Sequence, residues 1–161
     1  MNKYFKIYLQ KEADGAEVKE TIADFGMYCM EYPFVLYSEV KDVTKRSWYD
    51  EDGDDEYIPE NGQYIQSYEN SVKFGFKGKE FGANEKLRSF LDYLRSGMMK
   101  MYCEFNKVGR QHIRFKSVKQ TLCRDKNDGD LLVVTVTFKF NDPVTDIKPT
   151  TDASGNVTKL S

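Results

Sequence analysis

The ten residues from Leu131 to Phe140 constrain the fold most, because apolar and polar side chains alternate along them almost without interruption. Leu132, Val134, Val136, Phe138 and Phe140 share one parity, and Thr135, Thr137 and Lys139 share the other. Successive side chains of a β-strand point to opposite faces of the sheet, so this pattern predicts a strand with one face in a core.

Neighbouring segments extend the prediction to a whole sheet. Residues 63–76 repeat the alternation, with Tyr64, Tyr68, Val72, Phe74 and Phe76 on one parity. Segments 98–105 and 110–122 are also strand-like, and turn-forming residues follow each of them at 106–109 and 125–130. Turn residues between alternating runs are typical of antiparallel hairpins.

One amphipathic helix is expected at residues 84–96. Leu87, Phe90, Leu91 and Leu94 follow one another at the spacing of a single buried helix face. Asn84 is a candidate N-cap, and Gly97 can end the helix in a left-handed conformation. The fold class predicted is therefore α+β: an antiparallel β-sandwich or partly open barrel with one amphipathic helix packed on it.

Residues 1–141 are expected to form a single β-rich domain that contains an acidic loop at 49–60. Residues 142–161 hold two prolines, four threonines and few large apolar side chains, so a flexible C-terminal tail is expected there. No apolar run approaches a membrane helix, and the first residues lack the pattern of a signal peptide. Synthesis in the bacterial cytoplasm is therefore expected.

The chemistry-bearing residues do not form a recognisable catalytic or metal site. The three cysteines, Cys29, Cys103 and Cys123, do not have the spacing of a zinc site or a disulfide framework, and we interpret them as buried, reduced thiols. His112 has no second histidine or cysteine pair nearby, so a role as metal ligand or catalytic base is not expected. The acidic loop lacks the glycine and closing glutamate positions of a calcium loop. No glycine-rich phosphate motif or nucleophile elbow is present. We therefore predict no enzyme activity, no cofactor and no metal.

Charge is distributed unevenly along the chain. Residues 1–60 contain 15 acids and 7 bases, whereas residues 86–126 contain 11 bases and 3 acids. Opposite charges on one chain favour head-to-tail contact between copies, although two solvated faces of a monomer would show the same pattern. The predicted subunit contacts are Asp50, Asp52, Asp54, Asp55, Glu56, Arg110, Arg114 and Lys116.

The order of elements between Gln63 and Val144 resembles the tail-tube and distal-tail proteins of long-tailed bacteriophages. The resemblance rests on the strand Tyr68–Phe76, the helix Glu85–Ser96, the strands 98–105 and 109–115, and a closing strand 132–140 that leads into Asn141-Asp142-Pro143. It implies a β-sandwich or barrel flanked by a helix. It also implies assembly into rings, commonly of six subunits, as a phage or prophage tail or baseplate component in the virion.

Three functions are therefore expected, in decreasing order of preference. The first is a structural, non-enzymatic tail protein that self-assembles into a ring and contacts other tail components, without a membrane or a specific nucleic-acid sequence as partner. The second is a soluble bacterial domain that binds a protein or small ligand as a monomer or dimer. The third is a nucleic-acid-binding module, which would use the basic and aromatic residues of segment 102–124 as a stacking surface.

Overall fold

An antiparallel sheet of seven strands forms the body of the protein, as shown by the computed structural model, which describes residues 4–78, 82–126 and 129–161. The strand order is β2-β1-β7-β8-β9-β6-β3. The strands are β1 (Ile7–Lys11), β2 (Val18–Glu20), β3 (Tyr28–Cys29), β6 (Tyr68–Lys77), β7 (Met99–Cys103), β8 (Val108–Lys126) and β9 (Gly129–Phe140). Residues 127–128, within the expected turn at 125–130, lie outside the described residues.

The sheet curls until the chain just before β1 meets the end strand β3. Just before β1, the Phe5 N–H donates a hydrogen bond of 2.9 Å to the carbonyl of Cys29 in the end strand β3. This isolated bridge joins the chain at β1 to the far edge of the sheet. The result is a partly open barrel, so the predicted α+β fold class is confirmed.

Strands β9 and β6, which are neighbours in the sheet, supply much of the core from the alternation that the sequence shows. All five apolar side chains of the expected β9 face are fully buried, and Val72 and Phe74 of β6 pair with Val136 and Val134. Burying each such side chain contributes about 1.5–3 kcal/mol. The core therefore lies on the concave side of the sheet.

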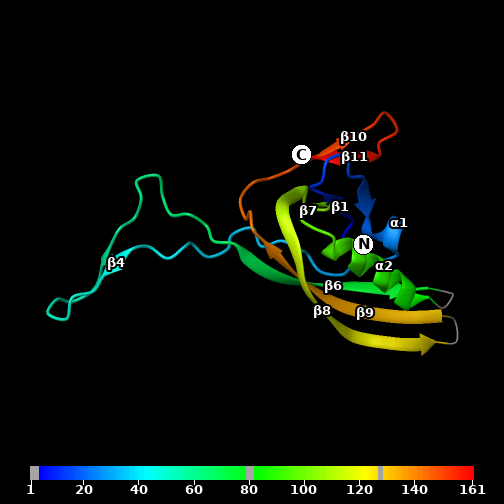
Figure 1. Cartoon of the computed structure of the whole chain (residues 1–161), viewed down its shortest axis with the longest axis horizontal. Helices are drawn as coiled ribbons and strands as arrows, with labels where there is room; N and C mark the ends of the chain where they lie inside the picture. The colour runs from blue at the N-terminus through cyan, green and yellow to red at the C-terminus, as the bar shows by residue number, and fades with distance from the viewer. Residues whose placement is uncertain (1–3, 79–81, 127–128) are drawn as a thin grey trace.

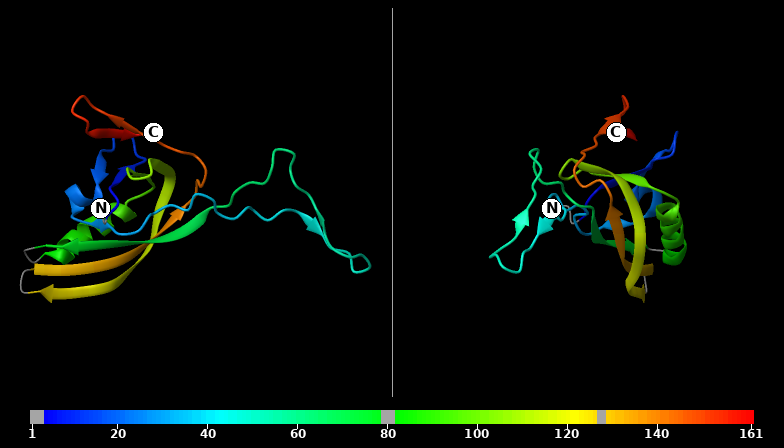
Figure 2. Two further views of the ribbon diagram at one scale, coloured as in Figure 1. Left: turned by 180° about the vertical axis from the view of Figure 1, so that it is seen from behind. Right: turned by 60° about the vertical axis from the view of Figure 1, so that its left-hand side comes forward.

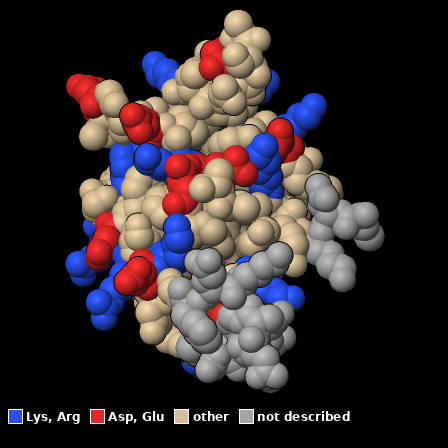
Figure 3. Space-filling view, turned by 90° about the vertical axis from the view of Figure 1, so that its right-hand side faces the viewer, with Lys and Arg blue, Asp and Glu red and all other residues tan. Residues whose placement is uncertain are grey.

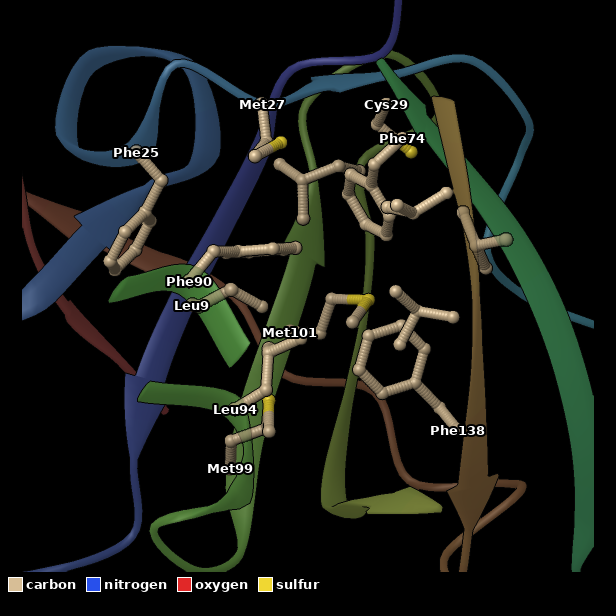
Figure 4. Close-up of a cluster of buried hydrophobic side chains, with 14 of the residues drawn as sticks. Leu9, Phe25, Met27, Cys29, Phe74, Phe90, Leu94, Met99, Met101 and Phe138 are labelled. Atoms are coloured by element: carbon tan, nitrogen blue, oxygen red, sulfur yellow. The ribbon is translucent and has the colours of Figure 1, made fainter. Parts of the chain in front are cut away.

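Helix α2 (Ala83–Arg95) closes over this core, as predicted. Phe90 and Leu94 are fully buried, and the Phe90 ring lies 5.1 Å from that of Phe74 (Figure 4). A second helix, α1 (Thr21–Phe25), was not predicted. It places Phe25 against Phe90, with ring centroids 5.3 Å apart.

The expectation of a flexible tail at residues 142–161 is wrong for this structure. Strands β10 (Pro149–Thr151) and β11 (Val157–Leu160) form a hairpin that lies against the body. Ile147 and Leu160 are buried beside Tyr102, and the Leu160 N–H donates to the Gln10 side chain at 2.8 Å. These two residues, with the partly buried Val157 packed against them, anchor a segment that is mostly polar.

A long arm, residues 36–66, leaves the body between β3 and β6 (Figures 1 and 2). Its tip region contains strands β4 (Lys45–Arg46) and β5 (Asp55–Glu56), which pair with each other. Its two legs are joined nearer the body by Gln66 N–H to the Glu39 carbonyl at 2.9 Å and by Lys41 N–H to the Tyr64 carbonyl at 2.7 Å. The expected strand at 63–76 therefore begins only at Tyr68, and residues 63–66 belong to the arm.

Candidate interaction surfaces

The arm carries apolar and aromatic side chains that the body does not cover. No residue between Leu36 and Gln66 is buried. Its large exposed apolar residues are Leu36, Tyr37, Val40, Trp48, Tyr49, Tyr57, Ile58 and Tyr64. Tyr49 is 101% exposed and Tyr57 68%, so the Tyr49 ring gains no packing within one copy and the Tyr57 ring gains little. Exposed apolar groups gathered on one projection are typical of a surface that contacts another protein.

The arm tip is also strongly acidic. Residues 48–60 include seven acids and no base. The predicted contact residues Asp50, Asp52, Asp54, Asp55 and Glu56 are all exposed there. Asp54 lies 3.5 Å from the Lys45 ammonium, and a hydrogen bond from Ser47 together with this charge lowers the pKa of its carboxyl.

Cation binding by this loop would need converging carboxylates. Among the residues that the structure describes, no group of three or more His, Cys, Asp or Glu side chains could hold a metal ion. The two cysteines with described side chains, Cys29 and Cys103, are buried and free. Burial raises the pKa of the Cys29 thiol to about 12, so it is protonated at neutral pH and is a poor nucleophile.

The predicted basic contacts divide between the surface and the interior. Arg114 and Lys116 are exposed on β8, and the Lys116 ammonium lies 2.6 Å from Glu69 of β6. Arg110 is only 4% exposed, contrary to a role as a surface contact. The C-terminal segment covers it, because Ile147 N–H bonds to the carbonyl of neighbouring Gly109 at 3.3 Å.

Arg110 lies at a hollow of about 300 Å³ near the root of the arm. Its guanidinium donates to the Asp146 carboxylate and, at 2.9 Å, to the Gly109 carbonyl, while Nε has no hydrogen-bond partner among the described residues. The Asp146 carboxylate neutralises the buried charge. We therefore assign Arg110 to holding the C-terminal segment on the body.

Sequence reasoning missed an open edge on β8. Strand β7 pairs with β8 only as far as Ile113, whereas β9 pairs with β8 along the rest of its length. Beyond Ile113, no described strand pairs with the other edge of β8. The lengths of the expected strands could have revealed this edge, because strand 98–105 is too short to pair with the whole of 110–122.

A groove runs between this open edge and helix α2. It has a volume of about 420 Å³ and is lined by Arg88, Leu91, Asp92, Arg95, Phe115 and Val118. Its floor is apolar, and Arg88, Asp92 and Arg95 stand on its helix side, where the Arg95 guanidinium lies 3.2 Å from the Asp92 carboxylate. Unpaired strand edges beside an apolar groove bind extended segments in many proteins.

The arm and this groove are far apart within one copy. The arm projects from one end of the molecule, and the long β8–β9 hairpin reaches the other end (Figure 1). Viewed from the end away from the arm, Lys and Arg are interspersed with Asp and Glu, so the face is mixed (Figure 3). The structure does not bring the predicted acidic and basic contacts together in one chain.

Comparisons with protein-family models, with curated proteins and with solved structures find no match to this chain. None of the described helices is long and apolar enough to cross a membrane. The arm, the open edge of β8 and the charges around them are the structural features that bear on function.

Proposed function

We propose that this protein is a structural, non-enzymatic subunit that assembles with copies of itself into a ring, as a component of a phage or prophage-derived tail. Assembly uses the arm, the open strand edge and complementary charge. The preferred setting is a tail-tube or distal-tail component, which meets other tail proteins as well as its own copies.

The arm is the observation that carries this proposal. Ordering a chain segment costs about 1–2 kcal/mol per residue in backbone entropy, and burial against other groups normally offsets that cost. Residues 36–66 gain little burial from their own body, yet they expose Trp48 and several tyrosines. A second protein surface would supply the missing burial, and large exposed aromatics are common at the centres of such interfaces.

The position of the arm supports head-to-tail assembly. A contact between the arm of one copy and the opposite end of another uses two different surfaces. Such heterologous contacts produce a closed ring when the rotation between copies closes, and a filament when it does not. The barrel with a helix over its core also agrees with the fold that the resemblance to tail proteins implies.

Sedimentation velocity across about 1–100 μM protein tests this proposal, at about 50 mM and about 300 mM salt. We expect concentration-dependent assembly that weakens at the higher salt, and ring-shaped particles by negative-stain electron microscopy. A strict monomer at every protein and salt concentration contradicts the proposal.

A second candidate function is binding of a small apolar ligand, which one observation favours. Tyr4, Tyr28, Met30 and Phe76 line a largely apolar hollow of about 260 Å³ on the body. That volume is slightly below the range of about 300–1,000 Å³ typical of ligand pockets. Saturable quenching of tyrosine fluorescence by an apolar dye, lost in Met30→Trp, would favour this function.

A further inference from the structure

The open edge of β8 has backbone groups available for pairing over several residues. Its ladder with β9 is interrupted by irregularities between Phe115 and Ser117 and between Gln120 and Leu122. Because bulges and lysines limit pairing at sheet edges, an added strand can pair only with a regular stretch of this edge. The regular stretch Ser117–Gln120 lies between the two irregularities, so an added strand of about four residues fits there.

The two sides of this edge differ in chemistry. Val118 pairs with the buried Val136, so it points to the groove beneath α2. Lys119 pairs with Thr135 and points to the opposite side, where Lys116 also lies. Arg95 is already paired with Asp92, and Lys116 with Glu69. A strand added here would therefore meet an apolar floor, with Arg88 on one side and Lys119 on the other as cations that form no ion pair with a described residue.

The arm contains a segment with matching chemistry. Strand β5 pairs with β4 on one edge, and no described strand pairs with its other edge. Asp54 to Ile58 around this strand are all exposed and include three acids, a tyrosine and an isoleucine. The segment thus carries backbone pairing capacity, negative charge and apolar surface together.

We propose that residues 54–58 of the arm of a second copy add as a strand to the open edge of β8, in the groove between β8 and α2. This inference rests on the proposed self-assembly and names the surface that receives the arm. The occupant is a second copy, because Arg88 and Lys119, one on each side of the edge, complement the acidic arm.

Alternation along the added strand assigns the side chains. With Tyr57 over the apolar floor formed by Leu91, Phe115 and Val118, Asp55 falls on the same side, toward Arg88. Glu56 then falls on the opposite side, toward Lys119. Acidic and apolar residues of the arm thus meet basic and apolar residues of the groove in one register.

Two variants test the two sides of this contact, one in the β8 edge and one in the arm. Arg88→Glu with Lys119→Glu reverses the charge of the edge, and Tyr57→Lys places a cation over the groove floor. All three side chains are exposed, and none forms an ion pair with a described residue. We expect each variant to weaken self-association by about tenfold or more in sedimentation velocity, with an unchanged circular dichroism spectrum.

Mixing the edge variant with the arm variant is a sharper test than measuring each variant alone. The edge variant retains its arm and the arm variant retains its edge, so one productive contact remains possible between them. We expect a one-to-one heterodimer that grows no further. Matched controls are Tyr49→Lys at the arm tip and Lys148→Glu with Lys159→Glu on the C-terminal hairpin, which should change association by less than about threefold.

The outcomes distinguish this inference from the proposed function. If the wild type assembles and both variants assemble equally well, the inference is overturned while self-assembly stands. A wild type that remains monomeric overturns both. Salt-sensitive binding of a single-stranded oligonucleotide that the edge variant alone loses, with self-association unaffected, also overturns it and assigns the edge to nucleic acid.

Discussion

The Asp142 carboxylate closes the turn that leads from β9 into the C-terminal segment. It accepts hydrogen bonds from the Gln111 side chain at 3.0 Å and from the Thr145 and Val144 N–H groups at 3.1 and 3.3 Å. Burial raises the pKa of this carboxyl, but the hydrogen bonds from Gln111, Thr145 and Val144 outweigh it and lower the pKa from 3.8 to about 2. The folded state therefore favours the ionised form.

This shift makes a prediction about acid stability. A carboxyl with a depressed folded pKa stabilises the protein above its unfolded pKa, and the contribution is lost as the pH falls toward the folded value. We expect Asp142→Asn to lower the free energy of unfolding by up to about 1 kcal/mol at neutral pH, because solvent still reaches part of the group and screens its charge. In urea titrations, the difference from wild type should shrink between about pH 4 and pH 2. A constant difference over that range would contradict the role of the charge.

Gly109 is a second residue with a testable constraint. A Cβ at this position would lie 2.6 Å from both Cγ1 and the carbonyl oxygen of Ile147. Gly109→Ala should therefore displace the C-terminal segment and cost about 1–3 kcal/mol, measured by chemical unfolding. Hydrogen exchange should also rise at residues 147–160.

Gly75→Ala is the matched control for this substitution. Its Cβ would approach only the Met30 sulfur at 3.1 Å, and that flexible, partly exposed side chain can move aside. We expect a cost below about 1 kcal/mol. Equal losses in the two alanine variants would show that the contact with Ile147 is not a tight constraint.

Among the elements, helix α2 depends on a residue far away in the sequence. The Asp130 carboxylate of β9 accepts hydrogen bonds from the Gly82 and Ala83 N–H groups at 2.9 and 3.1 Å. It satisfies backbone donors that a helix leaves open at its start, and its charge lies near the positive end of the helix dipole. The N-cap expected from the sequence, Asn84, lies inside the helix instead and is exposed.

Two alanine variants test this assignment. Asp130→Ala should lower the free energy of unfolding by about 1–2 kcal/mol, as the loss of a capping side chain commonly does. Asn84→Ala should change it by less than about 0.5 kcal/mol, since its side chain points to solvent. Thermal unfolding followed by circular dichroism measures both, and a larger loss for Asn84→Ala would favour the original prediction.

These elements also show what a sequence can and cannot predict. The alternation in β9 and the Phe90–Leu94 stripe were predictable, because each is set by local periodicity and each lies against the core. Capping by Asp130 was not, since the two partners are 47 residues apart. Helix α1 is five residues long, too short for a periodic signal. The hairpin β10–β11 depends on only two buried residues, Ile147 and Leu160.

At the scale of the whole molecule, the arm also could not be predicted from the sequence. Hydrophobic pattern identifies residues that need burial, but it does not say whether the protein's own core or a partner buries them. The acidic loop at 49–60 was predictable from composition. The exposed state of Tyr37 and Tyr64 was not, because similar residues in neighbouring segments, such as Phe34 and Tyr68, pack in or against the core.

Removing the arm tests its role in the whole molecule. Val40 and Ile65 form an isolated antiparallel bridge, so an Asn-Gly turn can replace residues 41–64 and join these two positions. Because no replaced residue is buried, we expect the free energy of unfolding to stay within about 1 kcal/mol of wild type. The melting temperature should shift by no more than about 4 °C. Sedimentation velocity should show a monomer at concentrations where the full chain assembles. Assembly of the shortened chain would show that other surfaces hold the copies together, and its unfolding would show that the arm is part of the fold.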